Sequence, residues 1–175
     1  TTHLTTPSGN IHGMSLAALC GLGDPRLTAL YDEPVPVIDP GKVAIIGARD
    51  LDLGEKDNLR SAGALVLSME QVDRIGMVAA LEQCIEQVSR DVDGIYLSMD
   101  LDALDPRFAP GVGTPVPGGL TYREGHLACE VVAETGKLIG MDVVEVNPIL
   151  DEKNQTAKIA VEFACSALGS RVWQG

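Results

Sequence analysis

Three carboxylates follow one apolar run of the chain. The run 94–97 is followed closely by Asp100, Asp102 and Asp105. Asp100 and Asp102 are spaced i, i+2, and on an extended strand this spacing places both side chains on the same face. Like charges so close repel each other unless a cation lies between them, and carboxylate oxygens suit Mg, Ca or Mn. The spacing therefore predicts a metal site at the end of a buried strand, although an acidic turn that only caps the strand would look the same.

Further acidic side chains lie at or near the ends of other predicted strands. Asp50 and Asp52 follow the apolar run 43–47, and Glu145 lies within the run 138–146. The carboxyl ends of parallel strands meet at one edge of a sheet, so these side chains are expected to converge there. Asp50 and Asp52 would alternatively cap the following helix, whereas a carboxylate between valines in a buried strand needs a partner. The convergence predicts a pocket for a metal and a positively charged ligand.

A short polar segment near the start combines three side-chain chemistries. Ser8, Asn10 and His12 supply a hydroxyl, an amide and an imidazole, with Gly9 and Gly13 among them. Glycine allows a sharp turn or the close approach of a ligand to the backbone. His12 is interpreted as a general acid or base, as a metal ligand, or as a histidine that merely starts a helix.

Apolar runs and helical periodicity alternate along the chain. Continuous apolar runs predict buried strands, a 3.6-residue apolar period predicts amphipathic helices, and glycine and proline clusters predict loops. The predicted strands span 43–47, 64–68, 94–99 and 138–146. The predicted helices span 14–20, 55–62, 75–88, 122–135 and 156–168, with irregular segments at 1–10, 24–41 and 109–119. The alternation predicts one α/β domain with a mostly parallel sheet and helices on both faces.

The composition excludes several classes of protein. Of the 175 residues, 45% are hydrophobic and 22% are charged, which excludes general disorder. The net charge of −12 argues against nucleic acid and anionic membrane surfaces as partners. No apolar run is long enough to span a bilayer. The four cysteines form no CxxC pair and are expected to be buried free thiols of a cytoplasmic protein.

Two long segments resemble the signature of the ureohydrolase family, which includes arginase, agmatinase and formimidoylglutamase. These segments are 98–106 and 109–124. Three shorter segments, 8–13, 47–52 and 145–148, resemble the arginase branch in particular. Together the matches extend over nearly the whole chain. The resemblance implies the three-layer α/β/α fold of that family and the hydrolysis of L-arginine to L-ornithine and urea.

The resemblance also implies a role for each candidate residue. Asp100 and Asp102 would be ligands of two Mn²⁺ ions, with Asp100 as the bridge, and a metal-activated hydroxide would attack the guanidinium carbon. Glu145 would hold the guanidinium, and His12 would pass a proton to the leaving amine. The implied substrate-binding set is Thr6, Ser8 and Asn10 for the α-carboxylate, Asp52 for the α-ammonium, and Thr114 beside the guanidinium.

Two features depart from the family pattern. Thr1 stands where arginases usually carry an Asn that contacts the carboxylate. The family's Asp-x-His-x-Asp motif and an upstream metal-binding His would lie before Thr1, and two aspartates alone cannot complete the coordination of two Mn²⁺ ions. We therefore expect residues 1–175 to be the carboxyl-terminal portion of a single ureohydrolase domain, with little or no activity by itself.

Two other functions stay open. An agmatinase, or a ureohydrolase for another guanidino substrate, would share the metal ligands but would not need a carboxylate-binding loop. A metal-free ureohydrolase-like subunit would need neither. The joint presence of His12, Asp100, Asp102 and Glu145 favours catalysis. The resemblance further implies a homo-trimer or homo-hexamer with a role in arginine metabolism, such as the urea cycle.

Overall fold

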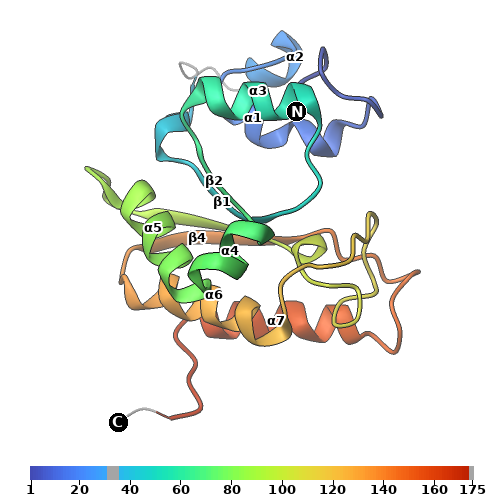
Figure 1. Ribbon diagram of the computed structural model, residues 1–175, viewed down its shortest axis with the longest axis vertical. Coiled ribbons are helices and arrows are strands. Elements are labelled where there is room, and N and C mark those ends of the chain that lie inside the picture. The colour runs from blue at the N-terminus through green and yellow to red at the C-terminus, as the bar shows by residue number, and fades with distance from the viewer. Residues whose placement is uncertain (31–35, 174–175) are drawn as a thin grey trace. The chain divides into compact units, whose positions relative to one another are not determined.

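The computed structural model describes residues 1–30 and 36–173 (Figure 1). The chain divides into two units. Unit 1 comprises Thr1–Ile45 and Asp50–Val66, and unit 2 comprises Ile46–Arg49 and Leu67–Gly175. Residues 31–35 of the segment predicted to be irregular lie outside the described residues.

Unit 1 consists mainly of short helices. Its helical elements are η1 (Ile11–Met14), α1 (Ser15–Leu19), α2 (Pro25–Thr28), η2 (Pro40–Lys42) and α3 (Leu53–Ala62). The prediction of an irregular segment was wrong for α2, where Asp24 accepts the Arg26 N–H at 2.8 Å and Pro25 starts the helix. An aspartate followed by proline is a helix-start signal, and here it outweighs the proline-rich surroundings.

The four predicted strands form two two-stranded sheets among the described residues, instead of one continuous sheet. β1 (Ala44–Ala48) pairs with β2 (Leu65–Ser68), and β3 (Ile95–Asp100) pairs with β4 (Leu138–Val144). β3 and β4 are parallel, as predicted. Apolar runs identify strands but do not specify which strands pair, and this explains the difference from the prediction.

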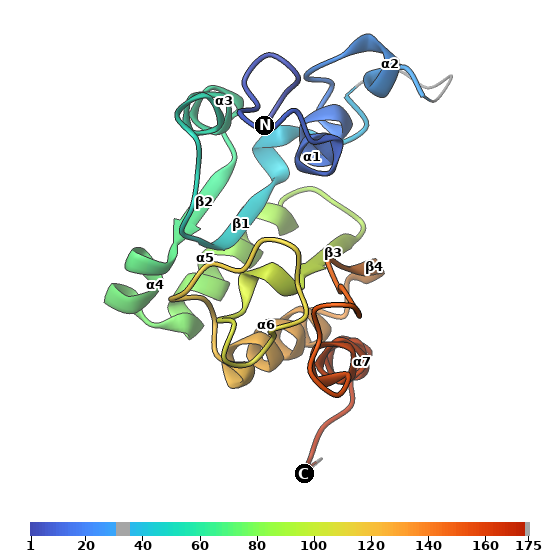
Figure 2. The same cartoon turned by 90° about the vertical axis from the view of Figure 1, so that its right-hand side faces the viewer.

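The core of unit 2 joins the β3–β4 sheet to two helices. α6 (Tyr122–Glu134) and α7 (Gln155–Ala167) pack side by side (Figure 2). The buried cluster consists of Met99, Leu101, Leu104, Ala109, Val112, Cys129, Ile159, Phe163 and Ala167. Leu101 and Leu104 are almost completely buried, at 0% and 1% exposure. They anchor the turn that follows β3, which carries Asp102.

The helix predicted over 75–88 is present two residues later, and a second helix that was not predicted precedes it. The predicted helix is α5 (Met77–Ser89), and the preceding one is α4 (Met69–Ile75). α4 begins with a capping box, in which Ser68 and Gln71 each bind the other's backbone N–H. Gly76, at φ +82°, separates the two helices. The apolar period predicted only α5. The Ser-x-x-Gln spacing, which is typical of a helix start, would have predicted α4.

The four cysteines are free thiols, but they are not all buried. Cys84 and Cys129 are buried, Cys20 is half-buried, and Cys165 is exposed, so the prediction of buried thiols was wrong for Cys165. Burial raises the pKa of the Cys84 and Cys129 thiols to about 11. Cys165 lies two positions after the fully buried Phe163 on α7, and this spacing turns it away from the core.

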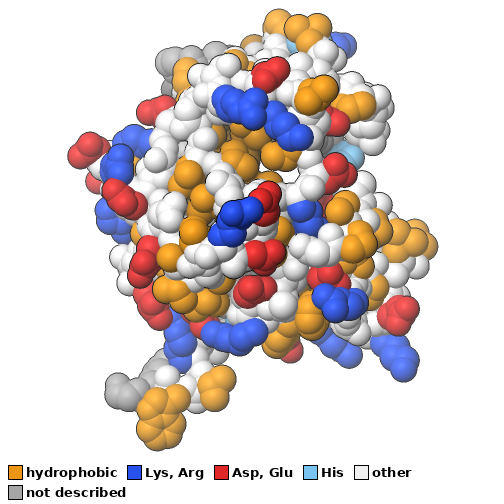
Figure 3. Space-filling model, in the orientation of Figure 1, with side chains coloured by type: hydrophobic (Ala, Val, Ile, Leu, Met, Phe, Trp, Pro, Cys, Tyr) orange, Lys and Arg blue, Asp and Glu red, His pale blue; other side chains and the backbone are white. Residues whose placement is uncertain are grey.

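Charged side chains of both signs are interspersed on the face of the molecule shown in Figure 3.

Along the described part of the chain, no helix has the length and apolar character needed to cross a membrane.

Asp105 ties the turn after β3 to the loop that follows it. Its carboxylate accepts hydrogen bonds from Arg107 Nε at 2.7 Å, from Arg107 N at 3.0 Å and from Gly118 N at 2.8 Å. The residue is only 4% exposed. The Arg107 side chain, followed by the two backbone N–H groups, holds the pKa of Asp105 well below its usual range.

β4 ends one residue before Glu145. Glu145 has a φ of +66°, in the left-handed region, which costs an L-residue roughly 1–2 kcal/mol relative to the right-handed one. The prediction that Glu145 sits between valines inside a buried strand was therefore wrong, because the backbone turns out of the sheet at this point. A strained conformation in a residue other than glycine is typical of a functional position.

Replacing Asp105 by Asn should lower the free energy of unfolding by about 1–3 kcal/mol near neutral pH, because the charge-assisted hydrogen bonds are lost. The folded-state pKa of Asp105 is depressed, so its stabilisation is present above the unfolded pKa of about 4 and fades as the pH falls toward the folded value. The gap between the wild-type chain and Asp105→Asn, measured by urea denaturation, should therefore shrink at about pH 3.

The matched control for this measurement is Asp57→Asn. Asp57 pairs with Arg60 at 3.5 Å, and both side chains are exposed, so its replacement should change stability by less than about 0.5 kcal/mol. Equal losses in the two variants, or a gap for Asp105→Asn that does not change with pH, would contradict this account of the turn.

Glu145→Gly should be more stable than Glu145→Gln by about 1 kcal/mol, because both remove the charge but only glycine relieves the left-handed backbone. The comparison is made by urea denaturation of the two variants. At Glu134, in the last turn of α6, the same two replacements should rank in the opposite order, since glycine weakens a helix by roughly 1 kcal/mol. If glycine were no better than glutamine at position 145, the strain at this residue would be refuted.

Candidate active site

The candidate site residues belong to two groups, one in each unit. Unit 1 contains Thr6, Ser8, Asn10, His12 and Asp52, and unit 2 contains Asp100, Asp102, Thr114 and Glu145.

Asp100 and Asp102 are brought together by a turn and not by strand alternation. β3 ends at Asp100, and Asp102 lies in the short helix η3 (Leu101–Ala103). The prediction of an extended backbone through both residues was therefore wrong for Asp102. The Asp100 carboxylate accepts the Asp102 N–H at 2.8 Å. Aspartate side chains commonly close turns in this way, and the turn here keeps the second carboxylate next to the first.

The carboxylates of unit 2 crowd one another electrostatically. The pKa of Asp100 is raised to about 6, first by desolvation and then by the negative charges of Asp102 and Glu145. The hydrogen bond from Asp102 N and the positive charge of Arg49 offset only part of this effect. Repulsion of this kind is relieved when a cation binds between the carboxylates.

Asp102 carries a carboxylate oxygen that has no partner. Its Oδ2 accepts a hydrogen bond from the Thr114 hydroxyl, whereas its Oδ1 is buried and makes no hydrogen bond with the described residues. A buried charged oxygen without a partner is costly and calls for an explanation. A hard cation would satisfy it, so Asp100 and Asp102 fit one side of a metal site.

The described residues do not complete a metal site. No three His, Cys, Asp or Glu side chains among residues 1–30 and 36–173 lie close enough together to hold a metal ion.

Thr114 and Glu145 lie beside this pair. The Thr114 hydroxyl is bound to Asp102. A Cβ added to the neighbouring Gly113 would lie 3.7 Å from Glu145 Oε2, an ordinary contact distance. Unit 2 therefore brings together the four residues that the sequence predicted for metal and guanidinium.

Gly119 is a residue of this region whose role the sequence pattern did not predict. A Cβ at this position would lie 2.5 Å from the Ala103 carbonyl oxygen and 2.7 Å from Asp105 N, so only glycine lets the loop 109–119 pack against the turn that carries Asp102. The pair Gly118-Gly119 signalled a turn but did not identify which backbone it approaches.

In unit 1 the polar segment forms a compact loop held by its own hydroxyls. Thr6 Oγ1 accepts the Gly9 N–H at 3.1 Å, and Ser8 Oγ accepts the Asn10 N–H at 3.2 Å. The two hydroxyls lie 3.4 Å apart, so only one of their two protons is used between them. The loop is exposed and keeps donor capacity for an external acceptor such as a carboxylate.

Asp52 stands at the N-cap position of α3, but its side chain makes no capping hydrogen bond. The alternative interpretation, in which Asp52 serves only as a helix cap, is therefore not supported. The carboxylate at this position can accept a hydrogen bond from a cationic group.

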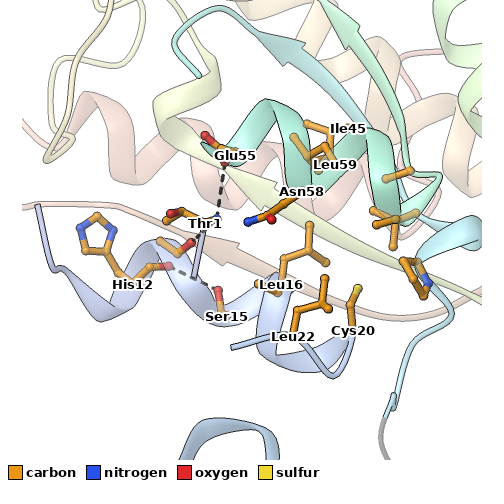
Figure 4. A pocket seen from close by; sticks show the side chains of 16 residues that line it. Thr1, His12, Ser15, Leu16, Cys20, Leu22, Ile45, Glu55, Asn58 and Leu59 are labelled. Carbon is orange, nitrogen blue, oxygen red and sulfur yellow. Dashed lines mark hydrogen bonds and ion pairs between the residues drawn. The ribbon is translucent and has the colours of Figure 1, made fainter. Parts of the chain in front are cut away.

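His12 lies in η1 and lines a cavity of about 220 Å³ within unit 1 (Figure 4). In Figure 4, Thr1, Glu55 and His12 lie toward one end of the cavity, and Leu22 and Cys20 lie toward the other. The Thr1 ammonium donates to the Gly13 carbonyl at 3.0 Å and lies 3.7 Å from a Glu55 carboxylate oxygen. His12 is therefore near the polar part of the cavity lining.

Comparison with known proteins places these features in a family. The family model described as the Arginase family matches residues 1–169. Arginase from Brevibacillus brevis is 48% identical over 171 residues, which cover 98% of this chain and 57% of that protein. The native structure of arginase from Bacillus caldovelox matches with a TM-score of 0.95 at 50% identity, over 99% of this chain and 57% of that chain.

A more distant structure agrees. Arginase from Entamoeba histolytica, solved in complex with L-ornithine, matches with a TM-score of 0.88 at 35% identity, over 97% of this chain and 56% of that chain. This chain therefore spans just over half the length of these relatives. The resemblance seen in the sequence and the predicted α/β fold are confirmed, and the chain belongs to the arginase family.

Proposed function

We propose that this chain supplies the carboxyl-terminal part of a manganese-dependent arginase, which hydrolyses L-arginine to L-ornithine and urea. The observation that supports this most strongly is the crowded pair Asp100 and Asp102, with its buried unpartnered oxygen, in a member of the arginase family. The complex of the Entamoeba histolytica relative with L-ornithine supports an amino-acid ligand.

Asp100 and Asp102 are proposed to hold one side of a manganese pair. When bound, manganese supplies a Lewis acid and a water of lowered pKa. The other ligands would come from the part of the relatives that this chain does not span, where the family carries its Asp-x-His-x-Asp motif and an upstream His. Thr114 donates to Asp102 Oδ2 and so orients the carboxylate, which leaves Oδ1 for the metal.

The remaining candidate residues divide the recognition of arginine between them. Glu145 accepts hydrogen bonds from the guanidinium in a charge-assisted pair, and His12 passes a proton to the leaving amine. The hydroxyl-rich loop that contains Thr6, Ser8 and Asn10 donates to the α-carboxylate. Asp52 accepts from the α-ammonium.

The trimeric or hexameric assembly, the cytoplasmic location and the role in arginine metabolism stay predictions. Gel filtration and light scattering of a joined protein, defined as this chain linked to the amino-terminal part of Bacillus caldovelox arginase, would test the assembly.

The proposal predicts that the 175-residue chain with added Mn²⁺ releases no urea from arginine. The joined protein, in contrast, should release urea and retain Mn. Asp102→Asn in the joined protein should lower Mn²⁺ affinity and urea release, because it removes a metal ligand. Loss of a residue that only supports a ligand lowers affinity or activity roughly 10- to 100-fold, and the loss here should be larger. A colorimetric urea assay and elemental analysis provide the readouts. Turnover by the 175-residue chain would contradict the need for further ligands, and a joined protein without Mn would favour a metal-free subunit.

The joined protein should prefer arginine over agmatine, which lacks the α-carboxylate. Ser8→Ala should weaken arginine turnover about tenfold or more through KM, since a hydrogen bond to a charged group contributes roughly 1.5–3 kcal/mol. The same variant should leave agmatine turnover unchanged. Preference for agmatine would instead point to an agmatinase. An equal effect of Ser8→Ala on both substrates would contradict the proposed contact of Ser8 with the α-carboxylate.

A further inference from the structure

We propose that Arg49 is a positioning residue, which holds Asp102 and Thr114 in register by bridging the two loops that carry them. The inference rests on the proposed function and deepens it. Arg49 follows β1, belongs to unit 2 together with both loops, and has no role assigned above.

The first loop is the turn after β3. Arg49 Nη2 donates to the Asp102 carbonyl at 2.7 Å and to the Leu104 carbonyl at 3.2 Å. Arg49 Nη1 donates to the Ala103 carbonyl at 3.2 Å. Three successive carbonyls, including that of a proposed metal ligand, therefore converge on one guanidinium.

The second loop is 109–119, which carries Thr114. The Val116 carbonyl accepts from Arg49 Nε at 2.9 Å and from Arg49 Nη2 at 2.6 Å. Thr114 is two residues away, and its hydroxyl binds Asp102. The guanidinium thus joins the two loops through their backbone carbonyls. The Thr114–Asp102 hydrogen bond joins the same two loops through side chains.

The chemistry of this bridge suits arginine and no other residue. A planar guanidinium offers five N–H donors in a fixed fork, whereas a lysine ammonium is a point charge with three donors. The hydrogen bonds described for Arg49 all end on backbone carbonyls. Arg49 therefore fixes the path of the backbone under Asp102 and Thr114, and Arg49→Lys would keep the charge but lose the fork.

Arg171 provides a matched control, because its loss should affect stability but not the candidate site. Its guanidinium also donates to backbone carbonyls, those of Glu130 at 2.9 Å, Ser170 at 3.0 Å and Ser166 at 3.2 Å. These residues lie on or next to α6 and α7 and include no candidate site residue. Arg171 also pairs with the exposed Glu134 at 3.6 Å, and lysine keeps the charge for this pair. Arg171→Lys therefore removes the same kind of fork without touching the loops that Arg49 bridges.

The first measurement is amide hydrogen exchange on the 175-residue chain and its two variants. Arg49→Lys should speed exchange about tenfold at the hydrogen-bonded amides of the two loops, those of Asp102, Leu104 and Gly118, as expected when these loops open more easily. It should leave α5 unchanged. Arg171→Lys should affect only residues near 130 and 166–171. Unchanged exchange in both loops of the Arg49→Lys variant would refute the proposal that Arg49 bridges them. This measurement does not depend on any catalytic function.

The second measurement is Mn²⁺ affinity and arginine turnover of the joined protein. Arg49→Lys should weaken Mn²⁺ binding by about 10- to 100-fold, the usual effect of removing support from a metal ligand, and lower kcat, while its Tm falls no more than that of Arg171→Lys. Wild-type Mn²⁺ affinity in Arg49→Lys would overturn the positioning role. If the unmodified joined protein neither bound Mn²⁺ nor turned over arginine, the proposed function would be refuted. The exchange measurement would still test whether Arg49 bridges the two loops.

Discussion

The repulsion between carboxylates at the end of β3 is the constraint around which unit 2 is built. Desolvation and the charges of Asp102 and Glu145 raise the pKa of Asp100 to about 6, and Asp102 Oδ1 is buried without a partner. The electrostatic interactions between these carboxylates are unfavourable. The turn persists because Leu101 and Leu104 are packed in the core on either side of Asp102, so the backbone cannot move apart to relieve the repulsion.

The surrounding loops also hold this turn, through contacts with its backbone. Arg49 donates to carbonyls on both sides, Asp105 accepts the N–H of Gly118, and Gly119 lies against the backbone near Ala103. Preorganisation of this kind is what a metal site requires, because ligands that are already in place lose little entropy on binding. The left-handed backbone of Glu145 is a further sign that geometry here is fixed at the expense of local stability.

The sequence predicts elements well where one physical signal dominates. The four strands and the helices α6 and α7 followed from apolar runs and periods, with boundaries close to those observed. The expectation that the strands are buried was wrong for β4, which contains no fully buried residue, and for alternate positions of β3. Strand pairing could not be predicted, since it depends on contacts distant in sequence. The turn at Asp102 and the exit of Glu145 from β4 were missed because a continuous apolar run does not show where an extended backbone ends. Arg49 was visible as part of a motif, but the carbonyls of the two loops that it bridges lie more than fifty residues away.

The most direct measurement of the central claim is anomalous scattering at the manganese edge from crystals of the joined protein grown with Mn²⁺. The account predicts two anomalous peaks within bonding distance of Asp100 and Asp102, at roughly 2.0–2.2 Å, as for other small divalent metals bound by carboxylate oxygen. Peaks elsewhere in the protein, or Asp100 and Asp102 turned away from the ions, would contradict it.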